Sequence, residues 1–133
     1  MIFIDSNVPM YLVGGPHPHK TDAQLILEGL IVAKERLVCD AEVLQEIVHR
    51  YAAIGRSEAI EYAFAALLGV VDEVFPIERE DVRRAAQIVS GKDRQSARNA
   101  LHIAVMERYG IKTIFSFDQD YDHRPGLDRI SKI

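Results

Sequence analysis

The chain has 133 residues, of which 48% are hydrophobic and 27% are charged, a balance typical of a globular protein and not of a disordered one. This length suits one compact domain over residues 1–133, and no apolar run approaches the roughly 20 residues that a membrane-spanning helix needs. The formal net charge of −4 excludes a generally basic protein that coats nucleic acid.

Strand-like and helix-like segments alternate along the chain. Short apolar runs favour strands, whereas apolar residues spaced by three and four favour helices. Small polar residues such as Ser6, Asp40 and Ser96 can cap a following helix by accepting from its free N–H groups. In chain order the predicted elements are a strand over 1–4, a helix over 6–13, a helix over 21–33, a strand over 37–39, a helix over 40–51, a helix over 57–68, a strand over 70–77, a helix over 78–90, a helix over 96–109, a strand over 113–117 and a last short strand in the tail.

Two aspartates come directly after predicted strands. Asp5 follows the first apolar run, and Asp118 follows the strand over 113–117. Strands separated by helices predict parallel pairing through right-handed crossovers, and ligand sites of such sheets lie beyond the carboxyl ends of the strands. Aspartate is also a common turn residue, but together the two strand ends can open onto one cleft.

The helix predicted after Asp40 carries acidic residues beside its apolar stripe. Glu42 and Glu46 are one turn apart, and His49 follows nearly one turn later. Like charges at this spacing cost about 0.2–0.5 kcal/mol in an isolated helix, a penalty that a bound divalent cation would remove. On spacing alone, two exposed carboxylates in water are the favoured interpretation.

The helix predicted after Ser96 begins with a short polar residue, Asn99, and has His102 three residues later. Asparagine near a helix start is typically a capping residue, although its carbonyl oxygen can also bind a hard cation. A single histidine in an apolar helix is more often packed and hydrogen-bonded than a ligand. We therefore predict no catalytic role for His102.

Converging acids would suit phosphodiester hydrolysis. That reaction needs an activated water and neutralised phosphate oxygens, both of which Mg²⁺ or Mn²⁺ supplies. These ions prefer carboxylate oxygens and keep several waters, so acids from different segments must meet. A protein of negative net charge can then still bind RNA, because the ion bridges the RNA backbone to the acids.

Four segments of the chain resemble, in order, those of the PIN-domain family. The opening MIFIDSNV is similar to the first, and AEVLQEIVHRY is similar to the second, with Glu46 at its acidic position. SARNALHIAVMERYGI resembles the third, which usually has aspartate where this chain has Asn99. TIFSFDQDYD resembles the fourth, with Asp118 at the acidic position. Together they span nearly the whole chain, and the small size is similar to that of VapC-type toxins.

The resemblance implies a three-layer α/β/α PIN-like fold with a central parallel sheet. It also implies a Mg²⁺- or Mn²⁺-dependent endoribonuclease that cleaves structured RNA by a metal-activated water. The residues carried over as catalytic and metal-binding are Asp5, Glu46, Asn99 and Asp118, with Asp120 as a further metal ligand if the turn folds back. Ser6 and Asn7 would support Asp5 through hydroxyl and amide contacts.

The family also implies partners. VapC-type toxins pair with a small antitoxin protein that covers the site, and they form homodimers. Excess apolar surface over residues 51–68 suggests that this segment carries the dimer contact. Tyrosines in apolar patterns are more often core or interface residues than platforms for RNA bases; those of this chain include Tyr51, Tyr62, Tyr109 and Tyr121.

Asn99 is the departure from the family pattern. It removes one negative charge from the proposed cluster and cannot act as a carboxylate base. Three explanations fit: a weakened or inactive natural member, compensation by another acid such as Asp120 or Glu42, or a deliberate change that makes a toxic enzyme tolerable to its host.

Other functions fit the sequence less well. A PIN-fold protein that binds RNA or an antitoxin without cutting is the main alternative, and metal-dependent RNA turnover separates the two. A receiver domain would need a lysine at the end of a late strand to pair with a phosphorylated aspartate. A nucleotide-binding domain would need a glycine-rich phosphate loop, and Gly14-Gly15 alone is too little.

Two remaining features have simple interpretations. The stretch over 78–98 is net +2, which favours a solvated helix face, with a phosphate-contacting rim as the functional alternative. Its basic residues are Arg79, Arg83, Arg84, Lys92, Arg94 and Arg98. Cys39, the single cysteine, lies in an apolar run and is expected to be a small buried hydrophobe. A chain without an internal disulfide suits a reducing, cytoplasmic location.

Overall fold

The computed structural model of this chain describes residues 1–93 and 95–132, and in that part five parallel strands form one sheet. The strands are β1 (Ile2–Ile4), β2 (Leu37–Asp40), β3 (Glu73–Phe75), β4 (Thr113–Phe115) and β5 (Asp128–Ile130). The α-helices are α1 (Asn7–Val13), α2 (Pro18–Val32), α3 (Ala41–Ala53), α4 (Ile60–Leu68), α5 (Arg79–Ser90) and α6 (Ala97–Arg108), with short 3₁₀ helices η1 (Ser57–Ala59) and η2 (Gln119–His123).

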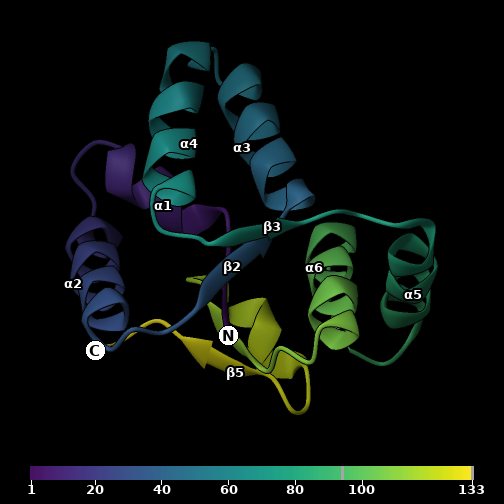
Figure 1. Cartoon of the computed structure of the whole chain (residues 1–133). Coiled ribbons are helices and arrows are strands. Elements are labelled where there is room, and N and C mark those ends of the chain that lie inside the picture. Colours follow the sequence, from purple (N-terminus) through teal and green to yellow (C-terminus); the bar gives the residue numbers. More distant parts are fainter. Residues whose placement is uncertain (94, 133) are drawn as a thin grey trace.

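Helices cover both faces of the sheet, which confirms the predicted three-layer α/β/α fold with a central parallel sheet. In Figure 1, α1 and α2 lie on one side of the sheet, α5 and α6 lie on the other, and α3 and α4 stand side by side at the top. β1 and β2 are buried along their whole length, as expected for strands with helices on both faces. No helix in residues 1–93 and 95–132 has the length and apolar character needed to cross a membrane.

The strand order reverses beside β1. The order across the sheet is β3-β2-β1-β4-β5, so β1 pairs with β2 on one side and with β4 on the other. Phe3 is in register with Val38 of β2 and with Ile114 of β4. Such a reversal is where parallel sheets place their ligand sites, at the carboxyl ends of the strands. Asp5 and Asp118 both lie at that end.

Several boundaries differ from those predicted: the strand over 113–117 ends at Phe115, the helix over 40–51 extends to Ala53, and two larger differences have a local cause. The helix predicted over 21–33 begins earlier, at Pro18, because the Nδ1 atom of His17 accepts from the His19 N–H at 3.0 Å and caps it. The strand predicted over 70–77 shortens to β3, because the N–H groups of residues 70 and 71 both donate to the Leu67 carbonyl and continue the turn after α4.

The predicted caps agree with the structure in two helices and not in a third. Asp40 accepts from the Val43 N–H at 3.0 Å at the start of α3, and Ser96 accepts from the Asn99 N–H at 3.1 Å at the start of α6. Ser6 precedes α1, but its side chain makes no capping hydrogen bond within the described residues. Its backbone is already helical, so its hydroxyl is not turned toward the first free N–H groups.

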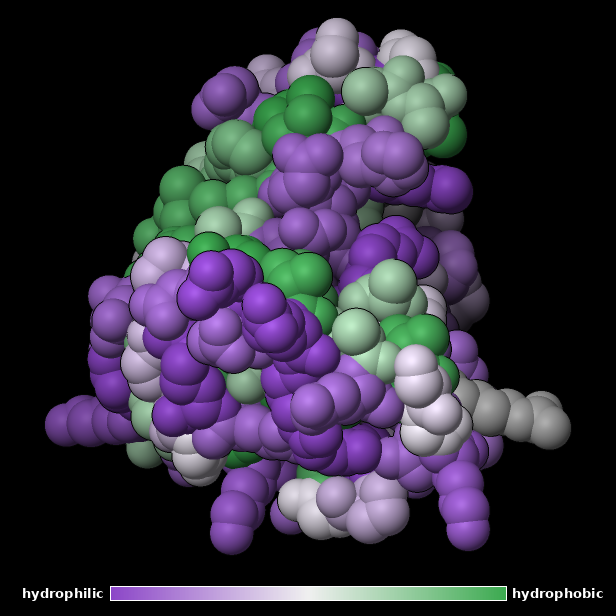
Figure 2. Space-filling view, turned by 90° about the vertical axis from the view of Figure 1, so that its right-hand side faces the viewer, coloured by the Kyte–Doolittle hydropathy of each residue, from purple (hydrophilic) through white to green (hydrophobic). Residues whose placement is uncertain are grey.

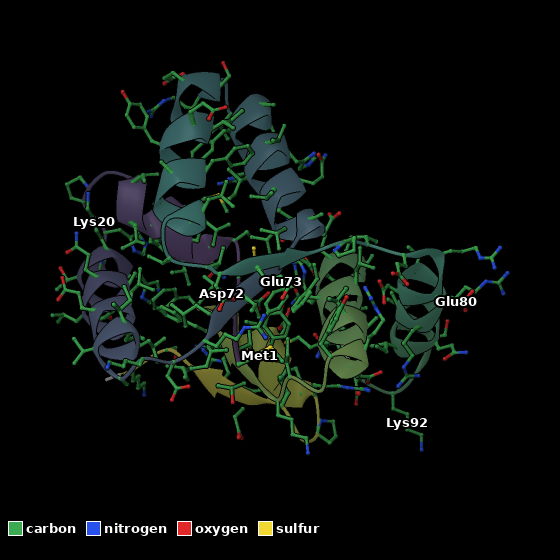
Figure 3. The ribbon with its side chains drawn as sticks, viewed as in Figure 1. Met1, Lys20, Asp72, Glu73, Glu80 and Lys92 are labelled. Carbon is green, nitrogen blue, oxygen red and sulfur yellow. The ribbon has the colours of Figure 1, made fainter. Side chains whose placement is uncertain are left out.

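Polar and apolar side chains gather on different parts of the surface. Figure 2 views the α5 side and shows hydrophilic residues over the lower part, with apolar residues gathered higher up, toward the level that α3 and α4 occupy in Figure 1. Figure 3 shows Glu80 and Lys92 pointing outward beside α5. It also shows Asp72 and Glu73 close together at the start of β3, where Arg36 binds Asp72 at 3.1 Å.

Candidate metal-binding active site

Asp5 lies where β1 ends and is held by short local contacts. One oxygen, Oδ1, accepts from the Ser6 backbone N–H at 2.8 Å. The other, Oδ2, accepts from the Ser116 hydroxyl at 2.6 Å and from the Asn7 amide at 3.4 Å. Burial raises the pKa of the Asp5 carboxyl, so a positive charge placed beside it would stabilise its ionised form.

The two residues predicted to support Asp5 do so in different ways. Asn7 contacts Asp5 through its side chain: its amide donates to Asp5 Oδ2 at 3.4 Å, and its carbonyl oxygen accepts from the Phe117 N–H at 3.2 Å. Ser6 uses its backbone N–H, and no contact between its hydroxyl and Asp5 is found among the described residues. The predicted hydroxyl contact is therefore replaced by a backbone contact.

Ser116 is a site residue that the sequence analysis missed. It is completely buried, its hydroxyl donates to Asp5, and the same oxygen accepts from the Asp118 backbone N–H at 3.0 Å. It therefore ties the end of β1 to the segment that follows β4. A polar residue within the apolar run predicted as a strand over 113–117, two positions before Asp118, was the signal that could have found it.

Glu46 is buried, which corrects the expectation of an exposed carboxylate. It lies on α3, and its Oε1 atom is 2.6 Å from Nε2 of His102. Its Oε2 atom is 3.7 Å from Nε of Arg98, an exposed side chain. Glu42, one turn earlier, is half-buried, and burial followed by the charge of Glu46 raises the pKa of the Glu42 carboxyl.

His102 connects Glu46 to Asp40. It lies on α6, it is completely buried, and its Nδ1 atom is 2.8 Å from Oδ2 of Asp40. Burial lowers the pKa of His102, but the charges and hydrogen bonds of Asp40 and Glu46 outweigh burial and leave the pKa well above its ordinary value. The histidine is packed and hydrogen-bonded, as predicted, but its partners are acids of the site.

Asn99 and Asp118 contact each other directly. The Asn99 amide donates to Asp118 Oδ2 at 2.8 Å, and Asp118 Oδ1 accepts from the Asp120 backbone N–H at 2.9 Å. Asp120 is exposed in η2, and its carbonyl oxygen accepts from the Gln95 side chain at 2.8 Å. The Asp120 backbone, and not its carboxylate, makes these contacts with the site.

The residues from four elements converge at the carboxyl end of the sheet. Single ligand atoms of Asp5, Glu46 and His102 lie within 4.8 Å of one another, the spacing of a metal-binding group. Asp118 adjoins this group through Ser116, which contacts both aspartates. The cluster therefore joins the ends of β1 and β4 to side chains of α3 and α6.

The family model described as the PIN domain matches residues 2–127. The chain belongs to the PIN-domain family. Ribonuclease VapC13 of Mycobacterium tuberculosis is 57% identical over 131 residues, which cover 98% of this chain and 100% of that protein. Ribonuclease VapC23 of the same species is 36% identical over 118 residues, covering 89% of this chain and 93% of that protein.

Solved structures have the same fold. VapC20 of Mycobacterium tuberculosis, described as a toxin that cleaves the sarcin–ricin loop, superposes with a TM-score of 0.77 at 22% identity, covering 94% of this chain and 95% of that one. VapBC2 of Rickettsia felis, bound to promoter DNA, gives a TM-score of 0.75 at 12% identity and covers both chains fully. At these identities the likeness concerns the fold.

The acids of this PIN-domain protein suit a hard divalent cation. Asp5 and Glu46 bring two buried carboxylates to one place, and Mg²⁺ and Mn²⁺ prefer carboxylate oxygens. Glu46 keeps one oxygen, Oε2, that the histidine does not occupy. The donor set therefore fits an ion that keeps several waters and few protein ligands.

The hydroxyl of Tyr121 is buried near the acids of the site. The residue is completely buried, and its hydroxyl has no hydrogen-bond partner within residues 1–93 and 95–132. Burial, and then the charges of Asp5, Glu46 and other acids of the site, raise the pKa of its phenol well above the ordinary value. Buried hydroxyls are normally paired, so a polar group such as an ion-bound water fits beside Tyr121.

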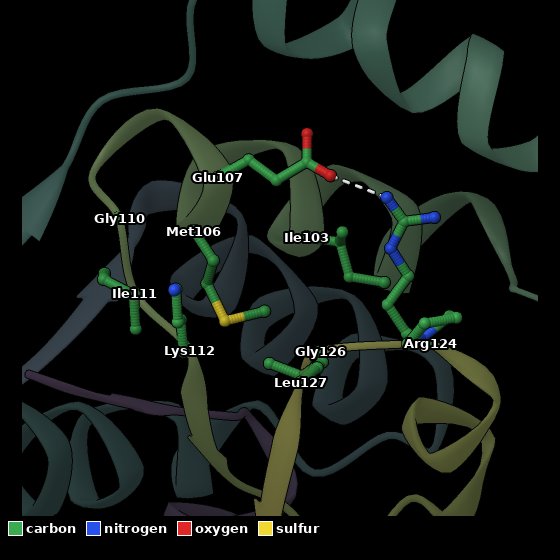
Figure 4. Close-up of a pocket in the computed structure, with 10 residues that line it drawn as sticks. Ile103, Met106, Glu107, Gly110, Ile111, Lys112, Arg124, Gly126 and Leu127 are labelled. Carbon is green, nitrogen blue, oxygen red and sulfur yellow. Dashed lines mark hydrogen bonds and ion pairs between the residues drawn. The ribbon is translucent and has the colours of Figure 1, made fainter.

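An open pocket elsewhere shares no residue with this cluster. It has a volume of about 340 Å³ and lies between the end of α6 and the loop before β5. Figure 4 shows Ile103 and Met106 lining its interior, with an ion pair between Glu107 and Arg124 across one side. It lies where β4 and β5 begin, at the opposite end of the sheet from Asp5.

The basic stretch over 78–98 behaves largely as a solvated helix face. Arg84 binds Glu107 at 2.8 Å, and Arg83 and Arg79 lie beside Glu80. Arg98 differs from these residues because it lies next to Glu46. Arg94, which was counted in the stretch, falls outside the described residues.

Proposed function

We propose that this PIN-domain protein is a Mg²⁺- or Mn²⁺-dependent endoribonuclease, the toxin of a toxin–antitoxin pair, that cleaves structured RNA. The observation that carries the proposal is the meeting of two buried carboxylates, Asp5 and Glu46, beside Asp118 at the carboxyl end of the sheet. The whole-length likeness to ribonuclease VapC13 also supports it.

Each residue of the cluster has a distinct role in the proposal. Asp5, Glu46 and Asp118 would hold the ion by carboxylate oxygens. The side-chain carbonyl of Asn99 and the carboxylate of Asp120 are proposed to contact this ion or the waters that it keeps. When bound, the ion supplies Lewis acidity, which activates water and neutralises phosphate oxygens.

The surrounding groups orient these acids. Ser116, Asn7 and the Ser6 N–H hold Asp5. Arg98, exposed beside Glu46, is placed to bind an RNA phosphate next to the reacting bond. The positively charged side chain of Arg98 therefore lies at the edge of the acid cluster.

The proposal includes partners. A small antitoxin protein would cover the site; a toxin–antitoxin complex from Klebsiella pneumoniae contains a chain of similar fold. A homodimer would form through the α3–α4 end, where apolar side chains including Tyr62 are exposed. We also propose that residues 1–133 work as a single PIN-like unit in the cytoplasm, where Cys39 stays reduced.

The deciding experiment compares the natural chain with Asp5→Asn. Mn²⁺ is titrated by calorimetry, and cleavage of labelled transfer and ribosomal RNA is measured with Mg²⁺, with Mn²⁺ and with EDTA. Asp128→Asn, an exposed aspartate on β5, is the matched control. Ion-dependent cleavage that Asp5→Asn abolishes and Asp128→Asn keeps would support the proposal.

The alternative function is a PIN-fold protein that binds RNA or an antitoxin without cutting. The specific observation in its favour is Asn99, which replaces an acid by a neutral amide next to Asp118. Absence of both Mn²⁺ binding and cleavage, with RNA or antitoxin binding retained, would establish that alternative.

A further inference from the structure

Three buried side chains from three elements form a continuous hydrogen-bonded row. Asp40 at the end of β2 contacts His102 of α6 at 2.8 Å, and His102 contacts Glu46 of α3 at 2.6 Å. Their exposed fractions are 0%, 0% and 5%. Only the last of them belongs to the acids predicted for the site, so the first two need an explanation of their own.

Both ring nitrogens of His102 face carboxylates. Nδ1 lies 2.8 Å from Asp40 Oδ2, and Nε2 lies 2.6 Å from Glu46 Oε1. Each nitrogen therefore already has a carboxylate as its partner. The ring also packs against Phe3 of β1, with centroids 5.2 Å apart, which fixes its place in the core.

In the described part of the chain, the orientation of the Glu46 side chain depends on its one hydrogen bond with His102, whereas Asp5 is held by three hydrogen bonds. Glutamate has a long side chain that loses considerable rotamer freedom when it is fixed. Asp5 is shorter and accepts from a backbone N–H, a hydroxyl and an amide. Within the described residues, Glu46 has one hydrogen-bond partner, His102, which binds Oε1; Oε2 makes no hydrogen bond there and lies 3.7 Å from Nε of Arg98.

We propose that His102 is a positioning residue that orients Glu46 for a divalent cation, and that Asp40 fixes the imidazole from behind. The proposal rests on the proposed function, because it assigns a role toward the same metal site. Neither residue touches the ion or the RNA in this scheme. Partners of ligating carboxylates of this kind typically change metal affinity or activity by about 10–100-fold when they are removed.

Asp40 has two tasks in this arrangement. Its Oδ1 atom caps α3 through the Val43 N–H at 3.0 Å, while its Oδ2 atom binds His102. The same carboxylate therefore sets the start of the helix that carries Glu46 and the ring that binds Glu46. Asp40 therefore fixes both the start of α3 and the ring that holds Glu46, and so joins α3 to α6.

The test uses variants that separate positioning from folding. His102→Leu removes both hydrogen bonds, His102→Gln keeps an amide that can reach Glu46, and Asp40→Asn keeps the cap on α3. Asp81→Asn is the matched control, because Asp81 is also a buried aspartate at a helix start, binding the Glu78 N–H at 2.8 Å far from the cluster. Thermal unfolding establishes that each variant is folded.

Calorimetry with Mn²⁺ is the first readout. We expect the Kd for Mn²⁺ to rise by about 10–100-fold in His102→Leu, with a smaller rise in His102→Gln and in Asp40→Asn. Asp81→Asn should bind Mn²⁺ like the natural chain even where its unfolding temperature falls. If the Mn²⁺ affinity of all four variants fell in proportion to their unfolding temperatures, the role of His102 would be purely structural and the proposal would be overturned.

Electron spin echo of bound Mn²⁺ is the second readout. Because His102 is placed behind Glu46, we expect no directly coordinated nitrogen in the natural chain. A coordinated nitrogen that disappears in His102→Leu would make the histidine a ligand and overturn the positioning role. Unchanged Mn²⁺ affinity in folded His102→Leu overturns this inference alone, whereas a natural chain that binds no Mn²⁺ overturns the proposed metal site as well.

Discussion

The Asn99 amide donates to the Asp118 carboxylate at 2.8 Å, so the residue that departs from the family pattern holds an acid of the site. An aspartate at position 99 would lose this donor and set two carboxylates against each other. We expect Asn99→Asp to lower the unfolding free energy of the metal-free protein by about 1–3 kcal/mol. The same change should strengthen Mn²⁺ binding and RNA cleavage, because the ion then neutralises one more acid.

Urea unfolding with and without Mn²⁺ measures both effects. Asn99→Ala is the control, since it removes the hydrogen bond without adding a charge, and it should weaken stability without strengthening Mn²⁺ binding. If Asn99→Asp left Mn²⁺ affinity and cleavage unchanged, Asn99 and Asp118 would not belong to the metal site.

Removing the Tyr121 hydroxyl is expected to affect stability and Mn²⁺ binding differently. Because this buried group lacks a partner in the described part of the chain, Tyr121→Phe should leave the metal-free protein equally stable or more stable by about 1 kcal/mol. Mn²⁺ affinity should fall, since an ion-bound water would lose its contact. Urea unfolding and calorimetry report the two effects separately. A clear loss of stability without metal would mean that the hydroxyl is already paired.

The strand-end acids were predictable from local pattern alone. An apolar run followed by aspartate locates Asp5 and Asp118 whatever the rest of the chain does, and parallel strands bring such ends to one edge. The helix cap at Asp40 followed from the same local reasoning. Local pattern was not sufficient everywhere, because the predicted cap at Ser6 does not form and the cap at His17 was missed.

The environment of Glu46 was not predictable in this way. Its burial depends on His102, which is 56 residues away in the chain, and His102 in turn depends on Asp40, 62 residues away. Helical spacing describes one helix and contains no information about which side chain of another helix faces it. The sequence pattern explains Asp40 as the cap of α3, and it gives no indication that the same side chain also contacts His102.

The Cys39 thiol should not react with iodoacetamide in the native protein. Burial, and then the neighbouring Asp40 charge, raise the pKa of its thiol to about 12, so at pH 8 the thiol stays protonated. Thiolates and not thiols react with iodoacetamide. Mass spectrometry should find no labelling of the native chain at pH 8 and complete labelling in concentrated urea. Rapid labelling without urea would mean that β2 opens under native conditions.

Arg98 should contribute more to RNA binding than the other exposed arginines of its region. It lies beside Glu46, whereas Arg79 lies beside Glu80 on the outer side of α5. We expect Arg98→Gln to weaken RNA binding and to reduce the slope of log affinity against log salt by about 0.7–0.9, the value for one lost phosphate contact.

Arg79→Gln removes the same charge away from the cluster and should leave that slope nearly unchanged. Fluorescence anisotropy with a labelled RNA at several salt concentrations measures both variants, with EDTA present to prevent cleavage. Equal effects of the two substitutions would mean that the arginines act only through the overall charge.

The exposed apolar end at α3 and α4 predicts a dimer that one substitution breaks. Tyr62 is 71% exposed near the start of α4, and Ile54, just after the end of α3, is 50% exposed. Large exposed apolar side chains typically mark an interaction site, and a lysine there would place an unpaired charge inside the contact.

Light scattering should give the natural chain twice the monomer mass of 15.0 kDa, and it should give Tyr62→Lys the monomer mass. Val82→Lys on α5, which is 54% exposed in the natural chain, should remain dimeric. Monomeric behaviour of the natural chain at all working concentrations would refute this dimer.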